Sequence, residues 1–144
     1  GRSADKLASV RDEIGAPIIT TVDQDEGRAL DTARGMVAYF AVVYYYDFLF
    51  DLAGYGEVRR EVARVNKERG FMEAIGLVPD GLIRKLSIVG TPAQCRQRLE
   101  ELRAAGLELA ILNAPGPRRV FGQPVRVPVD PLETCGAIVR HLAD

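Results

Sequence analysis

The sequence has few of the residues on which triads and metal centres depend. It contains 1 histidine and 2 cysteines among 144 residues. His141 finds no partners for a catalytic triad or a zinc site, so we assign it neither role and expect no metal. Cys95 and Cys135 lack metal-ligand spacing and lie at apolar positions of helical patterns. We interpret both as small buried hydrophobic residues in a reducing, cytoplasmic compartment.

The sequence also lacks an excess of either charge and a long apolar run. There are 19 basic and 20 acidic residues, so electrostatics give no reason to expect a nucleic acid or an anionic membrane as partner. The uncharged run over 35–46 is well short of the ~20 residues that cross a membrane. No Gly-x-Gly-x-x-Gly or phosphate-loop lysine motif occurs, which argues against a classical dinucleotide-binding fold. The chain starts at Gly1 without a methionine, which indicates a fragment or a processed product.

Three short apolar segments, each followed by a helical pattern, predict an α/β fold for a single domain over residues 1–144. We expect strands at Ala16–Val22, Leu86–Val89 and Leu107–Leu112. A long helix is predicted from Glu26 to about Leu52, and its second half is apolar on nearly every side, so it should be buried. The expected helical insertion consists of Glu57–Arg69, Phe71–Val78 and Pro79–Lys85. Three parallel strands cannot close a barrel, so we expect the back portion of something larger.

Helix caps give the sharpest local predictions. Thr91, Pro92 and Gln94 form a Thr-Pro-x-Gln capping box that starts a helix, and Gly106 suits a left-handed cap at its end. Asp23 and Glu26 have the spacing of a second capping box, at the start of the long helix. A third cap, Asp130-Pro131-Leu132-Glu133, is expected to start the final helix, after a proline- and arginine-containing loop.

Three blocks of this sequence, in this order, resemble luciferase-like flavin-dependent oxidoreductases. The resemblance spans about Ala16 to Gly116. Its blocks are Ala33-Arg34 with Ala38-Tyr39, then Leu77-Val78-Pro79-Asp80, then the run from Val89-Gly90-Thr91-Pro92 through Leu102 and Ala105-Gly106-Leu107 to Asn113-Ala114-Pro115-Gly116. Within this family, the sequence most resembles the deazaflavin-dependent, methylenetetrahydromethanopterin-reductase-like branch.

The resemblance implies a (β/α)8 TIM barrel of which this chain is the carboxyl-terminal part. It implies coenzyme F420, a deazaflavin, or FMN as cofactor, and a small organic substrate. In this family much of the cofactor contact and the usual catalytic candidates come from the front half of the barrel. We therefore name no catalytic residue here, and we expect the isolated piece to be inactive.

Residues at the predicted strand ends are the candidate polar contacts to the cofactor. Gly90 and Thr91 lie where a helix N-terminus favours an anion such as a phosphate; the turn and the cap alone are the favoured interpretation, and the two are compatible. Asn113 offers an amide to a ring carbonyl or a substrate oxygen, although Asn before Ala-Pro is common turn chemistry. Arg118, Arg119 and Arg126 make a basic loop that suits a phosphate, although a solvated loop is the simpler interpretation.

Aromatic residues of the long helix are the candidate apolar wall of the substrate pocket. Tyr44, Tyr45 and Phe48 belong to this set, together with Tyr46, and core packing is the competing interpretation, which we favour. The apolar Val37–Phe50 stretch also suits self-association. A non-catalytic α/β module that forms homo-oligomers or binds a protein partner is therefore the alternative function.

Overall fold

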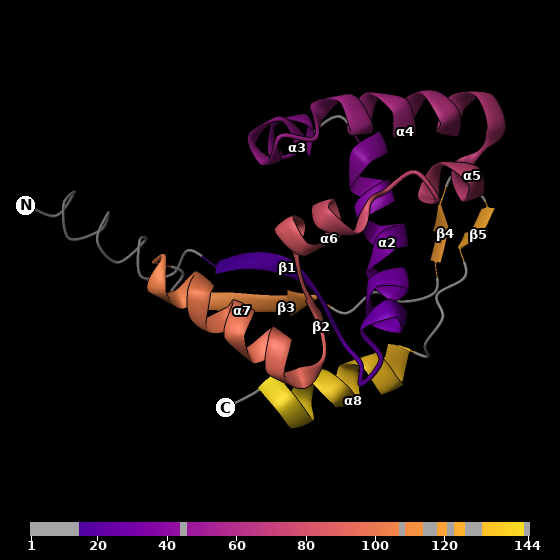
Figure 1. Ribbon diagram of the computed structural model, residues 1–144. Helices are drawn as coiled ribbons and strands as arrows, with labels where there is room; N and C mark the ends of the chain where they lie inside the picture. The colour runs from indigo at the N-terminus through magenta and orange to yellow at the C-terminus, as the bar shows by residue number, and fades with distance from the viewer. Residues whose placement is uncertain are drawn as a thin grey trace, which may run out of the picture.

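Strands and helices alternate along the computed structural model, which describes residues 15–43, 46–106, 109–113, 118–120, 123–125 and 131–142 (Figure 1). The elements in chain order are β1 Gly15–Val22, α2 Glu26–Val42, α3 Asp47–Ala53, α4 Gly56–Arg69, α5 Phe71–Ile75, α6 Asp80–Leu86, β2 Ser87–Gly90, α7 Pro92–Ala104, β3 Leu109–Asn113, β4 Arg118–Val120, β5 Gln123–Val125 and α8 Pro131–Leu142. The predicted α/β fold, with its helical insertion α4 to α6, is confirmed.

The three predicted strands form one parallel sheet in the order β2-β1-β3. β2 pairs with the second half of β1, from Ile19 opposite Ser87 to Val22 opposite Gly90. β3 pairs with the first half of β1, and this register ends with Ile19 opposite Asn113. The predicted common direction of the three strands is confirmed.

The strand order differs from that of an arc cut from a barrel, in which strands that follow each other in sequence are neighbours. Here the step from β1 to β2 and the step from β2 to β3 run in opposite directions across the sheet. Right-handed crossovers then place the connecting helices on opposite faces. Three strands cannot enclose a shared interior, so helices cover both faces of β1 instead.

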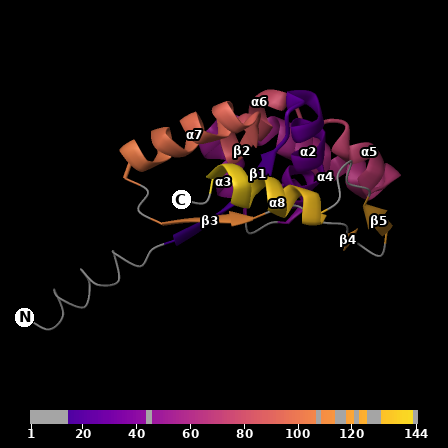
Figure 2. The ribbon, with the colours of Figure 1, turned by 90° about the horizontal axis from the view of Figure 1, so that it is seen from below.

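Two separate buried clusters mark these two faces. On one face, Ile19 of β1 packs with the buried side of α2 and with α4 to α6. On the other face, Val22 and Ile88 pack with Leu99 of α7 and with α8. Figure 1 shows α7 and α8 next to each other, with α3 to α6 on the other side of β1, and in the view from below α8 lies in front (Figure 2).

The predicted cap of α7 is confirmed, and the predicted cap of α2 is wrong by two residues. Thr91 Oγ1 accepts from the Gln94 amide at 3.4 Å, and Gln94 Oε1 accepts from the Thr91 amide at 2.8 Å. At the start of α2, Asp25 is the cap and accepts from the Arg28 amide, while Asp23 accepts from the Asp25 amide. Asp23 therefore makes a turn before the helix rather than the cap.

Gly106 has φ 103°, as expected for a left-handed cap. Asp130, the third expected cap, lies outside the described residues. The predicted loop before it contains the antiparallel ribbon β4-β5.

The predicted long helix is broken. α2 ends at Val42 because Val43 has extended backbone angles, φ −94° and ψ 112°. The expectation of burial on all sides is also wrong: Phe50 of α3 is fully buried, but Phe48 is 58% exposed and Leu52 is 83% exposed. In the described residues no single helix has both the length and the apolarity to cross a membrane. Only α2 and α3 taken together reach the required length and composition, and they are bent by 115°.

The two cysteines have different surroundings. Cys95 is buried, with Sγ 3.6 Å from the Thr21 carbonyl oxygen and 3.5 Å from that of Gly90, as the sequence interpretation requires. Burial raises the pKa of this thiol to about 12. Cys135 is exposed on α8, so its predicted burial is wrong.

Candidate functional site

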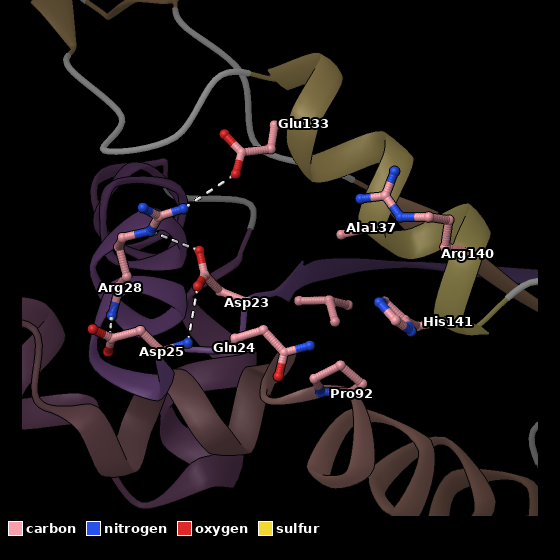
Figure 3. A pocket seen from close by; sticks show the side chains of 10 residues that line it. Asp23, Gln24, Asp25, Arg28, Pro92, Glu133, Ala137, Arg140 and His141 are labelled. Atoms are coloured by element: carbon pink, nitrogen blue, oxygen red, sulfur yellow. Dashed lines mark hydrogen bonds and ion pairs between the residues drawn. The ribbon is translucent and has the colours of Figure 1, made fainter.

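A cavity of about 410 Å³ lies at the carboxyl end of β1, between the first turns of α2 and α7 and the side of α8 (Figure 3). Parallel α/β sheets bind ligands at the carboxyl ends of their strands, most often where the strand order reverses, as it does at β1. The lining residues are Val22, Asp23, Gln24, Asp25, Arg28, Pro92, Glu133, Ala137, Arg140 and His141.

Arg28 ties three parts of this cavity together. Its Nε lies 2.7 Å from Asp23 Oδ2 in the loop after β1, and its Nη2 lies 3.2 Å from Glu133 Oε1 on α8. The hydrogen bond with Asp23 is the main reason why the pKa of Arg28 is raised. Asp23 is the less exposed of the two carboxylates, at 12%. The ion pairs hold the start of α2 against α8, and Figure 3 shows Arg28 between the two acids.

The other side of the cavity combines apolar surface with two further ionisable groups. Ala137, Arg140 and His141 come from one side of α8, and Pro92 opposes them from the start of α7. His141 supplies a group that both donates and accepts hydrogen bonds, and Arg140 supplies a permanent positive charge. This arrangement suits a polar or anionic organic molecule with an apolar part. The described residues contain no group of three histidine, cysteine, aspartate or glutamate side chains placed to hold a metal ion.

Gly90 and Thr91 lie next to this cavity, at the end of β2. The Gly90 carbonyl accepts from the Asp23 amide at 3.0 Å, which joins the loops that follow β1 and β2. Gly90 has φ 130°, and a Cβ added there would lie 2.3 Å from Gln94 Oε1. The structure thus explains Gly90 by the turn and Thr91 by the cap. Pro92 has no amide hydrogen and the Gln94 amide is used in the cap, so anion binding at this helix start stays a prediction.

Asn113, the other predicted polar contact, does not lie at the same height along the strand direction as Gly90 and Thr91. Asn113 is the last residue of β3 and pairs with Ile19, whereas Gly90 pairs with Val22. The end of β3 therefore falls about 10 Å short of the end of β2 along the strand direction. A cofactor contact by Asn113 stays a prediction. Arg118 and Arg119 lie in β4, and Arg126 lies outside the described residues.

The described residues of the predicted aromatic wall do not line this cavity. Tyr44 and Tyr45 lie outside the described residues. Phe48 lies beyond the far end of α2, which is 17 residues or about 25 Å long, and its side chain is mainly exposed. Tyr46 lines a different cavity, of about 420 Å³, with its ring stacked on Phe40 at 4.5 Å between centroids.

Sequence reasoning missed the ion pairs of Arg28. The available signal is the Asp-x-Asp pattern at 23–25 with Arg28 one turn into the helix, of which the capping-box prediction uses only Asp23, together with Glu26. Glu133 lies 105 residues away from Arg28 in sequence, so no local pattern connects them. His141 was discounted because it lacks triad and zinc partners, yet it lines the cavity.

Comparison with known proteins gives three findings. The family model described as luciferase-like monooxygenase matches residues 1–109. The 5,10-methylenetetrahydromethanopterin reductase of Methanopyrus kandleri is 30% identical over 116 residues, which are 80% of this chain and 32% of the relative. The solved structure of coenzyme F420-dependent tetrahydromethanopterin reductase from the same organism matches 96% of this chain and 37% of that one, with a TM-score of 0.69 and 24% identity. The last finding is a likeness in fold, and the chain spans about a third of the length of both relatives.

Proposed function

The chain belongs to the luciferase-like monooxygenase family, and from this premise we propose that it is the carboxyl-terminal part of an oxidoreductase. The cofactor is coenzyme F420 or FMN, and the substrate is a small organic molecule. F420 is favoured because both relatives are reductases of tetrahydromethanopterin derivatives and one is F420-dependent by description. The observation that supports this function in the structure is the cavity at the carboxyl end of β1.

The residues of this cavity fit part of such a cofactor. F420 and FMN both combine a flat ring with a phosphate. Val22, Pro92 and Ala137 offer apolar surface, and Arg140 and His141 offer donors to an anion. When bound, the cofactor supplies the hydride transfer, and the chain holds and orients it and keeps water out.

Arg28 serves this function as a positioning residue. Its ion pairs with Asp23 and Glu133 already use its charge, so it fixes α8 at the cavity instead of binding a ligand anion. Arg140 and His141, which come from the same helix as Glu133, then face Pro92 across the cavity. No residue of this chain is given a catalytic role, since the relatives are about three times as long. A (β/α)8 barrel for the complete protein belongs to this proposal, and it requires β2 to lie between β1 and β3 in the complete protein, in place of the order β2-β1-β3.

Fluorescence titration tests the proposal. The polypeptide that the gene encodes, and residues 1–144 alone, are titrated against oxidised F420 and against FMN. We expect a saturable change of fluorescence with one cofactor for the gene product, and weaker binding for residues 1–144 if the gene product is longer. No saturable change with either cofactor would overturn the proposal.

Matched variants test the place of binding. Removing a charged hydrogen-bond donor costs about 1.5–3 kcal/mol, so Arg140→Gln with His141→Gln should weaken binding about tenfold or more. Lys67→Gln is the control, because Lys67 is exposed on α4, which does not line the cavity. Equal binding by the double variant and the control would place the cofactor elsewhere.

A second candidate, self-association into homo-oligomers, rests on α3. Phe48 and Leu52 lie one turn apart on this helix and are both mainly exposed, which makes a small apolar surface suited to a second copy. Sedimentation velocity should show a dimer for the wild type and a monomer for Leu52→Glu. A monomeric wild type at high concentration excludes this candidate. The free thiols of Cys95 and Cys135 support a cytoplasmic location for either function.

A further inference from the structure

A second cavity, of about 420 Å³, lies where β1 extends beyond the start of β2. β2 begins at Ser87, opposite Ile19, so in the described part of the chain Gly15–Ile18 of β1 has no strand partner on that side. Side chains of α2, α3, α6 and α7 line the space that remains. This end of the sheet is opposite to the carboxyl ends of the strands, so the second cavity is separate from the one that contains Arg28.

The wall of the second cavity is apolar and partly aromatic. The side chains that form it include Ile18, Met36, Phe40, Tyr46, Leu49 and Leu102. A volume of this size is typical of sites for small organic ligands, and an apolar wall favours an alkyl or aromatic body. No aspartate or glutamate is among the lining residues.

Two cations line the same cavity. Arg98 of α7 has only long contacts: Nη1 lies 3.4 Å from Glu101 Oε2, and Nη2 donates to the Lys85 carbonyl at 3.4 Å. Its Nε is inaccessible to solvent and has no hydrogen-bond partner among the described residues. Lys85 Nζ donates to the Ala53 carbonyl at 2.9 Å and lies 5.5 Å above the Tyr55 ring. The lining residues therefore include two cations and no carboxylate, and the Glu101 carboxylate, which does not line the cavity, lies at a long 3.4 Å from Arg98. Arg98 Nε is a buried donor without an acceptor among the described residues.

We propose that this cavity binds an amphipathic monoanion, a small molecule with an apolar alkyl or aromatic body and one carboxylate. The body occupies the space between Met36, Phe40 and Leu102. The carboxylate accepts from the Nη atoms of Arg98, whose present contacts are both long, and pairs with the positive charge of its guanidinium. This site goes beyond the proposed oxidoreductase function, because its residues line no part of the cavity at Arg28.

Calorimetric titration with straight-chain carboxylates tests the site without any variant. From hexanoate to octanoate to decanoate, each added methylene should strengthen binding about fourfold, the ratio that corresponds to about 0.8 kcal/mol of apolar burial. Octan-1-ol, which has the same body without the charge, should bind at least about tenfold more weakly than octanoate. Equal binding of the alcohol, or no effect of chain length, would overturn the proposal.

Two matched pairs of variants test the residues. Arg98→Gln should weaken octanoate binding about tenfold, whereas Arg96→Gln, an exposed position on the same helix, should not change it. Leu102→Trp should fill the cavity and abolish binding, and Leu52→Trp, at an exposed position of α3, is its control. Thermal unfolding checks that each variant is folded. Loss of binding in a control, or full binding by both Arg98→Gln and Leu102→Trp, contradicts the assignment.

The same proteins separate this site from the proposed function. Saturating octanoate should leave the F420 and FMN titrations unchanged, because the two cavities lie at opposite ends of β1. Failure of cofactor binding together with a normal carboxylate series would overturn the oxidoreductase function alone. Displacement of either cofactor by octanoate would mean one shared site and would overturn the second one.

Discussion

Replacing Phe50 by alanine tests the face that α3 turns to the core. Phe50 is fully buried in the cluster that also contains Val62 and Leu82, so its truncation leaves a cavity in a region where several helices meet. Buried Phe→Ala substitutions cost about 3–5 kcal/mol. Phe48, two residues earlier on the same helix, is 58% exposed, and Phe48→Ala should change the free energy of unfolding by no more than about 0.5 kcal/mol.

Urea unfolding followed by circular dichroism measures the difference. The free energy of unfolding decreases by about 2 kcal/mol per molar urea, so Phe50→Ala should lower the urea concentration at the unfolding midpoint by about 1.5–2.5 M. Phe48→Ala should lower it by less than about 0.3 M. The pair shares helix and residue type, so propensity effects largely cancel. Equal losses of stability would refute the observed orientation of α3, and a larger loss for Phe48 would reverse it.

Three further predictions concern the start of α7 and its thiol. Thr91→Ala should cost about 1 kcal/mol of stability, and little more should be lost when Gln94→Ala is added, because the first change already breaks the capping box. Gly90→Ala should cost about 1–3 kcal/mol in urea unfolding, because φ 130° is strained for alanine. Ellman's reagent at pH 8 should modify Cys135 quickly and Cys95 only after unfolding, since burial raises the pKa of Cys95 to about 12. Equal modification rates of the two thiols would contradict the buried position. In the unfolded chain the pKa of Cys95 is near 9.0, so the free energy of unfolding should decrease as the pH rises from there toward 12.

Local chemistry accounts for the parts of the fold that could be predicted from sequence. The start of α7 depends on Thr91, Pro92 and Gln94, which all lie within one turn, and the structure has that cap. The strand at 15–22 and its parallel direction follow from a β-branched run and from long connections that only parallel strands require. Prediction was wrong where tertiary packing decides. The extended backbone of Val43 ends α2 inside a segment that is apolar throughout. Phe50 is buried and Phe48 is exposed because of where the other helices lie, which the local sequence does not determine.

The candidate site shows the same division. Gly90 and Thr91 were predicted as cofactor contacts because a strand end followed by a cap is visible in sequence. Both lie beside the cavity at β1, and their contact with a cofactor stays a prediction. Arg28 and Glu133 were not identified, because their ion pair depends on how α8 docks on the sheet. The resemblance to luciferase-like proteins supplied the family, which the family model confirms, but it did not supply the strand order.

The unequal lengths of two paired strands explain why this fold has a cavity at each end of its sheet. β1 has 8 residues and β2 has 4, and the register places all of β2 beside the second half of β1. At the carboxyl end the two strands finish together, so their loops meet and the Asp23 amide reaches the Gly90 carbonyl. At the other end β2 stops short, because α6 runs to Leu86 and leaves no residues to extend the pairing. The gap must then be lined by side chains, and mainly apolar ones from α2, α3, α6 and α7 cover it, with Lys85, Ser87 and Arg98 as the polar exceptions. A polar site and an apolar one therefore arise from a single feature of the sheet, the residue at which β2 begins.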